Sequence, residues 1–382
     1  MNLSKTVALA QSLVRIPSVT PDDNGCQKLV TEILEPLGCK CTTLCDSGTS
    51  NLIVMHGKGS PFTLFLGHTD VVPAGERKAW DHEPFCGDIL EYDGEMVLYG
   101  RGSADMKGGD AAMIMAMHDY IVKHPEHKGT IALLLTSNEE GDAKGATPFV
   151  VDNFLKKNNL IPDYCLIGEC SSDEYFGDSI KNGRRGDINY TIVVHGVQGH
   201  IAQEQYASNA VHAAAALIKA LEENPIDNGS DSFPPTSFQV SNIHAGTGAD
   251  NVIPGVCTLR CNSRYNDLQT VDSVKAHVEE WISKLNLKCD VSFQHDGEPF
   301  ITRGGRLIEV LSAKISEVLK VKPSLGSSGG TSDGRFIRPL GTETVEFGPV
   351  AKTIHKANER VSIKVLDDLK EIFYLTLEDL HK

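Results

Sequence analysis

Apolar positions along the first 180 residues follow two different periods. Helical spacing of apolar residues predicts a helix over 108–124, and short continuous apolar runs predict strands that are buried on both faces of a sheet. Because predicted strands and helices alternate, we expect a mostly parallel sheet covered by helices, an α/β architecture. The predicted strands are 51–57, 62–68, 130–136 and 164–169.

The pattern changes between residues 181 and 295. There the order becomes strand, helix, two strands, helix and strand, with polar and apolar residues alternating in the first strand. This order is typical of a small α+β unit with an open sheet, so we predict an inserted domain over 181–295. The predicted elements are 187–197, 209–223, 236–246, 255–265, 271–285 and 288–295.

The first pattern then resumes, with a helix over 305–320, a strand over 342–348 and a terminal helix over 365–380. One α/β domain, formed by 1–180 and 296–382, is therefore expected to be interrupted by the insert. A chain of 382 residues also exceeds what one compact core usually holds, which favours two domains.

Charge and composition narrow the possible partners. The formal net charge of -15 argues against nucleic acid or an anionic membrane as a partner, because both require a basic surface. Gln11 and Ser12 break the first apolar stretch, which predicts an amphipathic helix rather than a signal peptide, and no run approaches the ~20 apolar residues of a membrane span. We therefore expect a cytoplasmic protein. Its ten cysteines lack paired C-x2-C spacing, so they predict reduced thiols.

Side chains that can bind metals follow several predicted strands. Each has an ordinary explanation when taken alone, such as a solvated loop residue or, for Asp105, a helix N-cap. Together they fall at or just beyond carboxyl ends of strands, where open α/β sheets build their sites. We therefore interpret them as one site. The residues are His68, Asp105, Glu139, Glu140, Glu169 and His355.

The number of these residues suggests two metal ions. A catalytic zinc takes three protein ligands and keeps an open position, so two histidines and at least three carboxylates exceed the needs of one ion. Two zinc ions about 3.5–4 Å apart, bridged by a carboxylate and a water, would use the whole set. One of Glu139 and Glu140 could then bind metal while the other acts as a general base. Because Asp70 shares a face with His68 in extended backbone, its carboxylate is expected to fix the imidazole tautomer.

Several strings resemble the M20 family of dinuclear zinc amidohydrolases and peptidases, nearly from end to end of the chain. They are GHTDVVPAG (67–75), YGRGSADMKGG (99–109), SNEEGDAKGA (137–146), GE (168–169), VHGVQGHIA (194–202) and TIHKANE (353–359). The resemblance implies a catalytic α/β domain, an inserted dimerisation domain and a homodimer. It also implies two zinc ions per subunit, replaceable by cobalt.

The resemblance implies a role for each residue of the site. His68 and Glu169 would bind one zinc, Glu140 and His355 the other, and Asp105 would bridge the two. Glu139 would be the general base and Asp70 would orient His68. His200 would come from the partner subunit and stabilise the oxyanion, although a histidine in a polar turn is the ordinary explanation. Gln203 and Glu204 stand where relatives often have Tyr-Pro.

A further set of strings resembles the branch of this family whose substrate is a succinylated amino acid with three carboxylates and one ammonium. The resemblance implies that Arg184 and Arg264 bind carboxylates through the planar guanidinium fork, with hydrogen bonds from Asn251 and Thr331. Taken alone, either arginine would be a surface charge. The strings are IKNGRRG (180–186), FPPTSFQVSNIHAGTGADNVIP (233–254), GGTSDGRFI (329–337) and VEFGP (345–349).

Three alternatives are weighed against this interpretation. GSSGG (326–330) fits G-x-S-x-G, with Glu343 and His355 in the order of an α/β-hydrolase triad, but no buried strand precedes Ser328. A relative that only binds metal or peptide would not need Glu139 as a base. Acetylornithine deacetylases and dipeptidases of the same family are closer alternatives, which only the substrate-pocket strings argue against.

Overall fold

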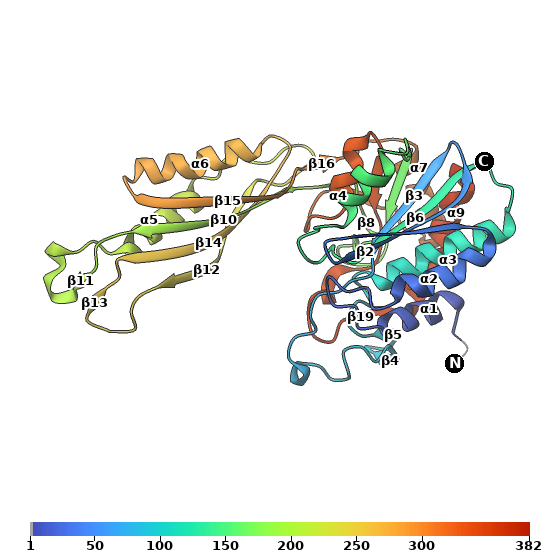
Figure 1. Ribbon diagram of the computed structural model, residues 1–382, viewed down its shortest axis with the longest axis horizontal. Coiled ribbons are helices and arrows are strands. Elements are labelled where there is room, and N and C mark those ends of the chain that lie inside the picture. The colour runs from blue at the N-terminus through green and yellow to red at the C-terminus, as the bar shows by residue number, and fades with distance from the viewer. Residues whose placement is uncertain (1–2) are drawn as a thin grey trace. The chain divides into compact units, whose positions relative to one another are not determined.

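The computed structural model describes residues 3–382 and divides them into two compact units (Figure 1). The first unit holds the chain up to Asn182, with Thr302–Gly326 and Ser332–Lys382. The second holds Gly183–Ile301 and Ser327–Thr331. It extends past the expected end of the insert because β16 (Phe300–Ile301) pairs with β9 (Gly183–Arg184).

An eight-stranded sheet forms the centre of the first unit, in the order β1-β2-β6-β3-β7-β18-β8-β17. The pairs that join β6, β3, β7 and β18 are parallel, which confirms the predicted parallel centre, whereas β1 and β2 pair antiparallel and β2 pairs antiparallel with β6. The strands are β1 (Lys40–Asp46), β2 (Thr49–Lys58), β3 (Phe62–His68), β6 (Gly129–Thr136), β7 (Tyr164–Ile167), β8 (Ser179–Lys181), β17 (Ser324–Gly326) and β18 (Glu343–Glu346).

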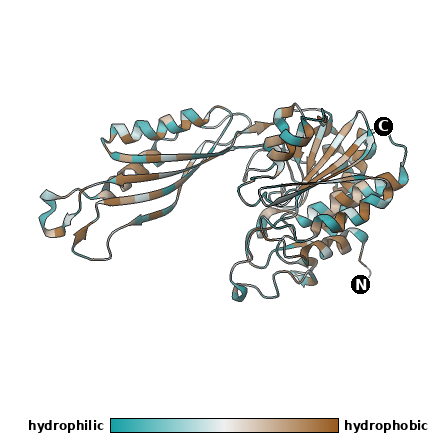
Figure 2. Ribbon diagram, in the orientation of Figure 1, coloured by the Kyte–Doolittle hydropathy of each residue, from teal (hydrophilic) through white to brown (hydrophobic). Residues whose placement is uncertain are grey.

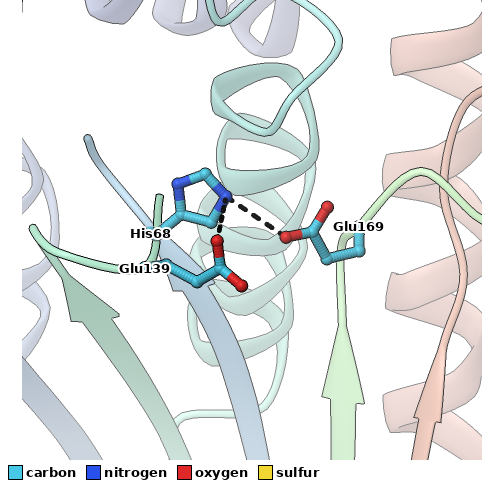
Figure 3. A group of neighbouring side chains, drawn as sticks. All are labelled: His68, Glu139 and Glu169. Carbon is cyan, nitrogen blue, oxygen red and sulfur yellow. Dashed lines mark hydrogen bonds and ion pairs between the residues drawn. The ribbon is translucent and has the colours of Figure 1, made fainter. Parts of the chain in front are cut away.

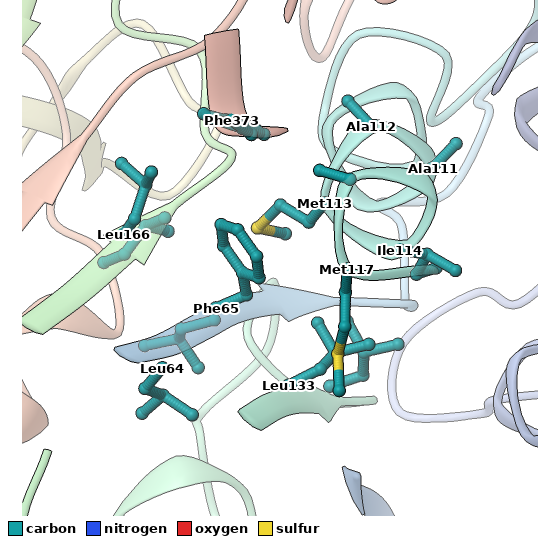
Figure 4. Packing of buried hydrophobic residues seen from close by; sticks show 14 of the residues in the cluster. Leu64, Phe65, Ala111, Ala112, Met113, Ile114, Met117, Leu133, Leu166 and Phe373 are labelled. Carbon is teal, nitrogen blue, oxygen red and sulfur yellow. The ribbon is translucent and has the colours of Figure 1, made fainter. Parts of the chain in front are cut away.

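Helix α3 (Lys107–Lys123) is the buried helix of this unit and packs against α1, α9 and β3. Its sequence is apolar on most sides, as expected of a helix in the interior. Met113 and Met117 lie near Phe65, Leu133 and Phe373 (Figure 4). Apolar residues also fill the central strands (Figure 2). The other helices are α1 (Lys5–Val14), α2 (Cys26–Leu34), α4 (Thr147–Val150), α7 (Arg306–Leu319), α8 (Gly334–Ile337) and α9 (Ile363–Leu380).

Two glycines bring the start of α3 against the end of β7. A Cβ at Gly109 would lie 2.1 Å from the carbonyl oxygen of Gly168, and a Cβ at Gly168 would lie 3.1 Å from the carbonyl carbon of Gly109. Only residues without side chains permit this approach. As a result, the loop that carries Asp105 lies beside the strand end that carries Glu169.

A three-stranded sheet that the sequence analysis did not predict joins two distant segments. Its strands are β4 (Asp88–Tyr92), β5 (Glu95–Tyr99) and β19 (Arg360–Ser362). Arg360 pairs with Tyr99, so the chain just after His355 lies beside the chain just before Asp105.

The second unit contains a four-stranded antiparallel sheet in the order β12-β14-β10-β15, with α5 (Ala210–Glu223) and α6 (Val271–Lys284) packed against it. The order of elements predicted for the insert is found here. Alternate residues of β14 are buried, which gives the sheet one apolar face. The strands are β10 (Gly186–His195), β12 (Ser237–Ala245), β14 (Val256–Tyr265) and β15 (Lys288–Gly297), with the short pair β11 (Gly199–His200) and β13 (Val252–Ile253).

Among the helices formed by residues 3–382, none combines the length and the apolar character that crossing a membrane requires.

Candidate functional site

The candidate site lies at the carboxyl ends of three neighbouring strands of the first unit. β3 ends at His68, β6 is followed by Glu139 and Glu140, and β7 is followed by Glu169. Because β6, β3 and β7 are adjacent and parallel, these ends meet at one edge of the sheet. The loop before α3 supplies Asp105 to the same place.

Asp105 lies between the two histidines. Its Oδ1 is 3.4 Å from His68 Nε2, and its Oδ2 is 3.2 Å from His355 Nε2. Asp105 does not act as a side-chain cap of α3, the ordinary role weighed for it above. One planar carboxylate thus presents a separate oxygen to each imidazole.

Each histidine also faces a glutamate of its own. His68 Nε2 lies 3.2 Å from Glu169 Oε1, and His355 Nε2 lies 3.1 Å from Glu140 Oε2. Glu139 is more distant, with its Oε2 4.0 Å from His68 Nε2 (Figure 3). The histidines and acids of the cluster therefore form two groups on either side of Asp105, and Glu139 is an additional acid beside one of them.

Contacts between unlike groups control protonation in the cluster. Burial opposes ionisation of Asp105, but hydrogen bonds from His355 and His68 outweigh it and hold the pKa of Asp105 below its usual value. Hydrogen bonds to Asp105 and Glu140 raise the pKa of His355 to about 10. Burial disfavours the charged form of His68, yet hydrogen bonds to Asp105 and Glu169 raise its pKa well above the usual value. The carboxylates therefore stabilise positive charge at both histidines.

Two glutamates of the cluster have too little positive charge nearby. Burial, followed by the charge of Asp105, raises the pKa of Glu169 to about 7. Burial also raises the pKa of Glu139 well above its usual value, with His68 opposing the shift and Asp333 adding to it. A cation or a proton at either carboxyl group would relieve this imbalance.

These donors fit divalent metal ions. Imidazole nitrogens and carboxylate oxygens are ligands that zinc takes, and carboxylates outnumber imidazoles here. Ligand atoms lie within 4.8 Å of one another in two groups, His68 with Glu139 and Glu169, and His68 with Asp105 and Glu140. His355 Nε2 in addition faces both Asp105 Oδ2 and Glu140 Oε2. The residues could therefore hold one cation at His68 and a second at His355, with Asp105 between them.

Asp70 is fully buried beside His68, but its contacts differ from the expected ones. His68 Nδ1 donates to the backbone carbonyl of Asp70 at 2.9 Å, while the Asp70 carboxylate lies 3.6 Å away. That carboxylate instead accepts the backbone N–H groups of Glu139 and Glu140, at 3.2 and 3.1 Å. Asp70 thus orients the imidazole through its main chain and holds the glutamate pair through its side chain.

A buried ion pair that was not predicted from the sequence lies behind Asp105. It is formed by Arg101 and Glu359, with 2.5 Å between Nη1 and Oε2. Both residues lie within strings that carry the family resemblance. Neither is a histidine, and neither was recognised as a residue at the end of a predicted strand, which are the features that identified the other site residues. The only available signal was a charged residue within a glycine-rich string, at Arg101.

The remaining predicted residues lie in the second unit. His200 is exposed, and its Nδ1 accepts the N–H of Ala202 at 3.1 Å. Asn251 adjoins it, because its backbone carbonyl accepts the N–H of Ile201. Arg184 is buried and donates to the backbone carbonyl of Ser328 at 2.7 Å, in the segment that also holds Thr331.

Arg264 is partly exposed and already has an acidic neighbour. Its Nη1 lies 2.8 Å from Asp187 Oδ2 in the adjacent strand β10. A guanidinium carries five N–H donors, so this pair leaves donors for a second anion. Asp187 was not singled out from the sequence.

The serine-hydrolase alternative lacks its acid–histidine pair. Glu343 accepts the backbone N–H groups of Arg306 and Leu307 at the start of α7. His355 faces Asp105 and Glu140 instead. Glu343 is therefore engaged in capping a helix.

Comparison with known proteins agrees with this geometry. The model of peptidase family M20/M25/M40 matches residues 64–379. Succinyl-diaminopimelate desuccinylase of Bordetella parapertussis is 44% identical over 380 residues, which cover 100% of this chain and 99% of the relative. The enzyme of the same name from Hydrogenovibrio crunogenus is 44% identical over 379 residues, 99% of each chain.

Solved structures share the fold at low sequence identity. The M20 family metallo-carboxypeptidase Sso-CP2 from Sulfolobus solfataricus superposes with a TM-score of 0.81 at 16% identity, over 99% of each chain. The Bacillus subtilis YXEP protein, described as a dinuclear metal binding peptidase from the M20 family, has a TM-score of 0.70 at 15% identity, over 98% of this chain and 97% of its own.

We expect His355 to stay protonated across neutral pH in protein that has been freed of metals by chelation. Because its pKa is raised to about 10, its interaction with Asp105 and Glu140 stabilises the fold fully below about pH 6.5, and this stabilisation is lost progressively as pH rises to about 10. Histidine ring ¹⁵N shifts followed from pH 6 to 11 would measure this, with His355→Gln identifying the signal. A His355 titration near pH 6.5 would contradict the expectation.

Proposed function

Since this chain belongs to peptidase family M20/M25/M40, we propose that it is a metal-dependent amidohydrolase acting on N-succinyl-L,L-2,6-diaminopimelate. The reaction takes up water and yields succinate and L,L-2,6-diaminopimelate, in diaminopimelate and lysine biosynthesis. The observation that supports metal-dependent hydrolysis is the position of Asp105, which offers one oxygen to each of two imidazoles. The additional acid Glu139 lies beside them. The substrate follows from relatives that match the whole chain.

The proposed cofactor is a pair of zinc ions in each subunit, replaceable by cobalt. His68 and Glu169 would hold one ion and Glu140 and His355 the other, with Asp105 shared between them. The contacts that support this are the two histidine–glutamate pairs on either side of Asp105. When bound, two such ions polarise the amide carbonyl and lower the pKa of the attacking water.

We assign the proton transfers to Glu139. It accepts a proton from the attacking water and delivers it to the nitrogen of the departing amine. Two observations support this role: Glu139 is farther from His68 than Glu169 is, and burial raises the pKa of Glu139 well above its usual value. Asp70 fixes the glutamate main chain and so aims Glu139.

His200 is proposed to stabilise the oxyanion of the hydrolysed amide in the partner's site of a homodimer. Its Nδ1 already accepts a backbone N–H, so neutral His200 carries its proton on Nε2, the nitrogen available to donate to an oxyanion. The homodimer is what the family resemblance implies, and the observation that supports it is β12, an edge strand of the second unit whose residues are largely exposed.

The proposed anion-binding residues are Arg184 and Arg264, with Asn251 and Thr331. A substrate with three carboxylates needs guanidinium groups because the chain as a whole carries a charge of -15. The contact with Ser328 orients Arg184, and the contact with Asp187 orients Arg264. The predicted cytoplasmic location stays a prediction.

The zinc-loaded protein should hydrolyse N-succinyl-L,L-diaminopimelate with kcat/KM at least about 30-fold above its value for N-acetylornithine or a dipeptide. A carboxylate recognised by a buried arginine contributes on the order of 2–5 kcal/mol, and 2 kcal/mol corresponds to about 30-fold. Succinate release and amine formation measure the rates.

Exhaustive chelation should abolish activity, and zinc or cobalt should restore it. Full activity in metal-free protein, or equal rates on acetylornithine, would refute the proposal.

The adjacent glutamates should respond differently to substitution. Glu139→Ala should keep two metal ions per subunit but lose about 10²–10⁴-fold in kcat, because the proton carrier is gone while the proposed ligands remain. Glu140→Ala should bind fewer metal ions. Metal analysis and steady-state kinetics measure both effects, with the exposed Glu32→Ala as the control. Equal metal loss in both variants would show that the roles are wrongly divided.

Activity should reappear when inactive Glu139→Ala and His200→Ala subunits form mixed dimers. If His200 acts across the dimer, one site of each mixed dimer collects both defects and the other keeps an intact Glu139 and an intact His200. Co-expression with two different tags isolates the mixed dimers, and the assay is succinate release. Purified mixed dimers that stay inactive would mean that His200 serves its own subunit.

A further inference from the structure

A buried ion pair lies directly behind Asp105, outside the set of proposed ligands and base. The side chains of Arg101 and Glu359 are only 3% and 0% exposed, with Arg101 Nη1 2.5 Å from Glu359 Oε2. Removing two charges from water has a large desolvation cost, so a buried pair is weak evidence of stabilisation in its own right. Its contacts indicate a different role.

Glu359 is attached to the Asp105 loop at three points. Its Oε1 accepts the backbone N–H groups of Ala104 at 3.0 Å and of Asp105 at 3.1 Å. Its backbone carbonyl accepts the N–H of Gly100 at 2.9 Å. Glu359 follows His355 closely in sequence, so one residue connects the loop that carries Asp105 to the segment that carries His355.

Arg101 compensates the charge that this attachment introduces. Without the guanidinium, Glu359 would add a further buried carboxylate to a cluster in which carboxylates already outnumber imidazoles. Arg101 is itself fixed. Its backbone N–H donates to the backbone carbonyl of Pro84 at 2.7 Å, and its guanidinium lies 5.3 Å from the centre of the Trp80 ring. The pair can therefore hold the loop without adding net charge.

A second carboxylate of the site makes the same kind of contact. Asp70 accepts the consecutive amides of Glu139 and Glu140, as Glu359 accepts those of Ala104 and Asp105. In both cases a fully buried acid fixes the main chain of a loop whose side chains face the histidines. This repetition points to the positioning of ligands rather than to general packing.

We propose that Glu359, with its charge balanced by Arg101, is a positioning residue that sets where the Asp105 carboxylate stands between the two metal ions. Because that carboxylate is rigid and faces His68 with one oxygen and His355 with the other, a shift of the Asp105 main chain changes both positions at once. Loss of the hydrogen-bond acceptor at Glu359 is therefore expected to weaken the binding of both metal ions. The inference rests on the proposed two-metal function.

The test measures metal binding without substrate. Zinc affinities of chelated protein are determined by competition with a chromophoric chelator, and the visible spectrum of the cobalt-loaded protein reports ligand geometry. Glu359→Ala should lower the affinity for both zinc ions by about 10–100-fold and change the visible spectrum of the cobalt-loaded protein. The Arg101→Met/Glu359→Gln double variant keeps an oxygen acceptor and leaves no unpaired charge, so its affinities should stay within about 3-fold of the unaltered protein.

Two further variants separate positioning from loss of stability. Thr302→Val removes buried hydrogen bonds in the same unit, where Thr302 bonds to Thr344, and should lower Tm without changing zinc affinity. If Glu359→Ala does not fold, Arg101→Met/Glu359→Leu replaces it, since this neutral pair lacks the acceptor. It should bind both zinc ions more weakly than Arg101→Met/Glu359→Gln does.

The outcomes separate failure of the positioning role from failure of the two-metal function. If the variants without the acceptor bind both zinc ions as tightly as the unaltered protein while losing Tm as Thr302→Val does, the positioning role is wrong and the two-metal function stands. If the affinity for only one zinc ion falls, the proposal that Glu359 acts on both metal positions through Asp105 is also wrong. If the unaltered protein takes up no zinc, the proposed function fails and the inference fails with it.

Discussion

Repulsion between carboxylates gathered at one edge of a sheet is the constraint on which the rest of this structure depends. Asp70, Asp105, Glu139, Glu140 and Glu169 lie around two imidazoles, and all but a small part of their surface is withdrawn from water. Such a cluster persists only if each acid has a compensating partner. The imidazoles, the backbone amides and the proposed metal ions supply those partners.

The fold supplies this compensation by fixing main chain rather than by adding basic side chains. Backbone N–H groups reach Asp70 from the loop after β6, and they reach Glu359 from the loop before α3. Amides bring no net positive charge that would compete with a bound cation. Arg101, which lies behind the cluster, is matched by Glu359. The site thus keeps its negative charge while its geometry stays defined.

The sequence predicted the parts of the molecule that local pattern determines. Continuous apolar runs identified β3, β6 and β7, and the polar residues at their ends indicated the site, because parallel strands place those ends together. The β4–β5–β19 sheet was missed, since β19 is three residues long and its pairing depends on a segment far away in the chain. The carboxylate contacts of Asp70 and the Arg101–Glu359 pair were missed for the same reason. Pairing between distant positions leaves no periodic signal, and the partner Asp187 of Arg264 appears only through strand register.

The order of strands in the large sheet has a consequence for synthesis of the chain on the ribosome. β18 lies between β7 and β8, yet it is made after the whole second unit. Until it arrives, the nascent first segment has an open sheet edge at β7, which is a template for aggregation, and it lacks His355. The emerging chain therefore depends on its last segment both to close the sheet and to complete the proposed ligand set, so a truncated product would be prone to aggregate and is expected to be inactive.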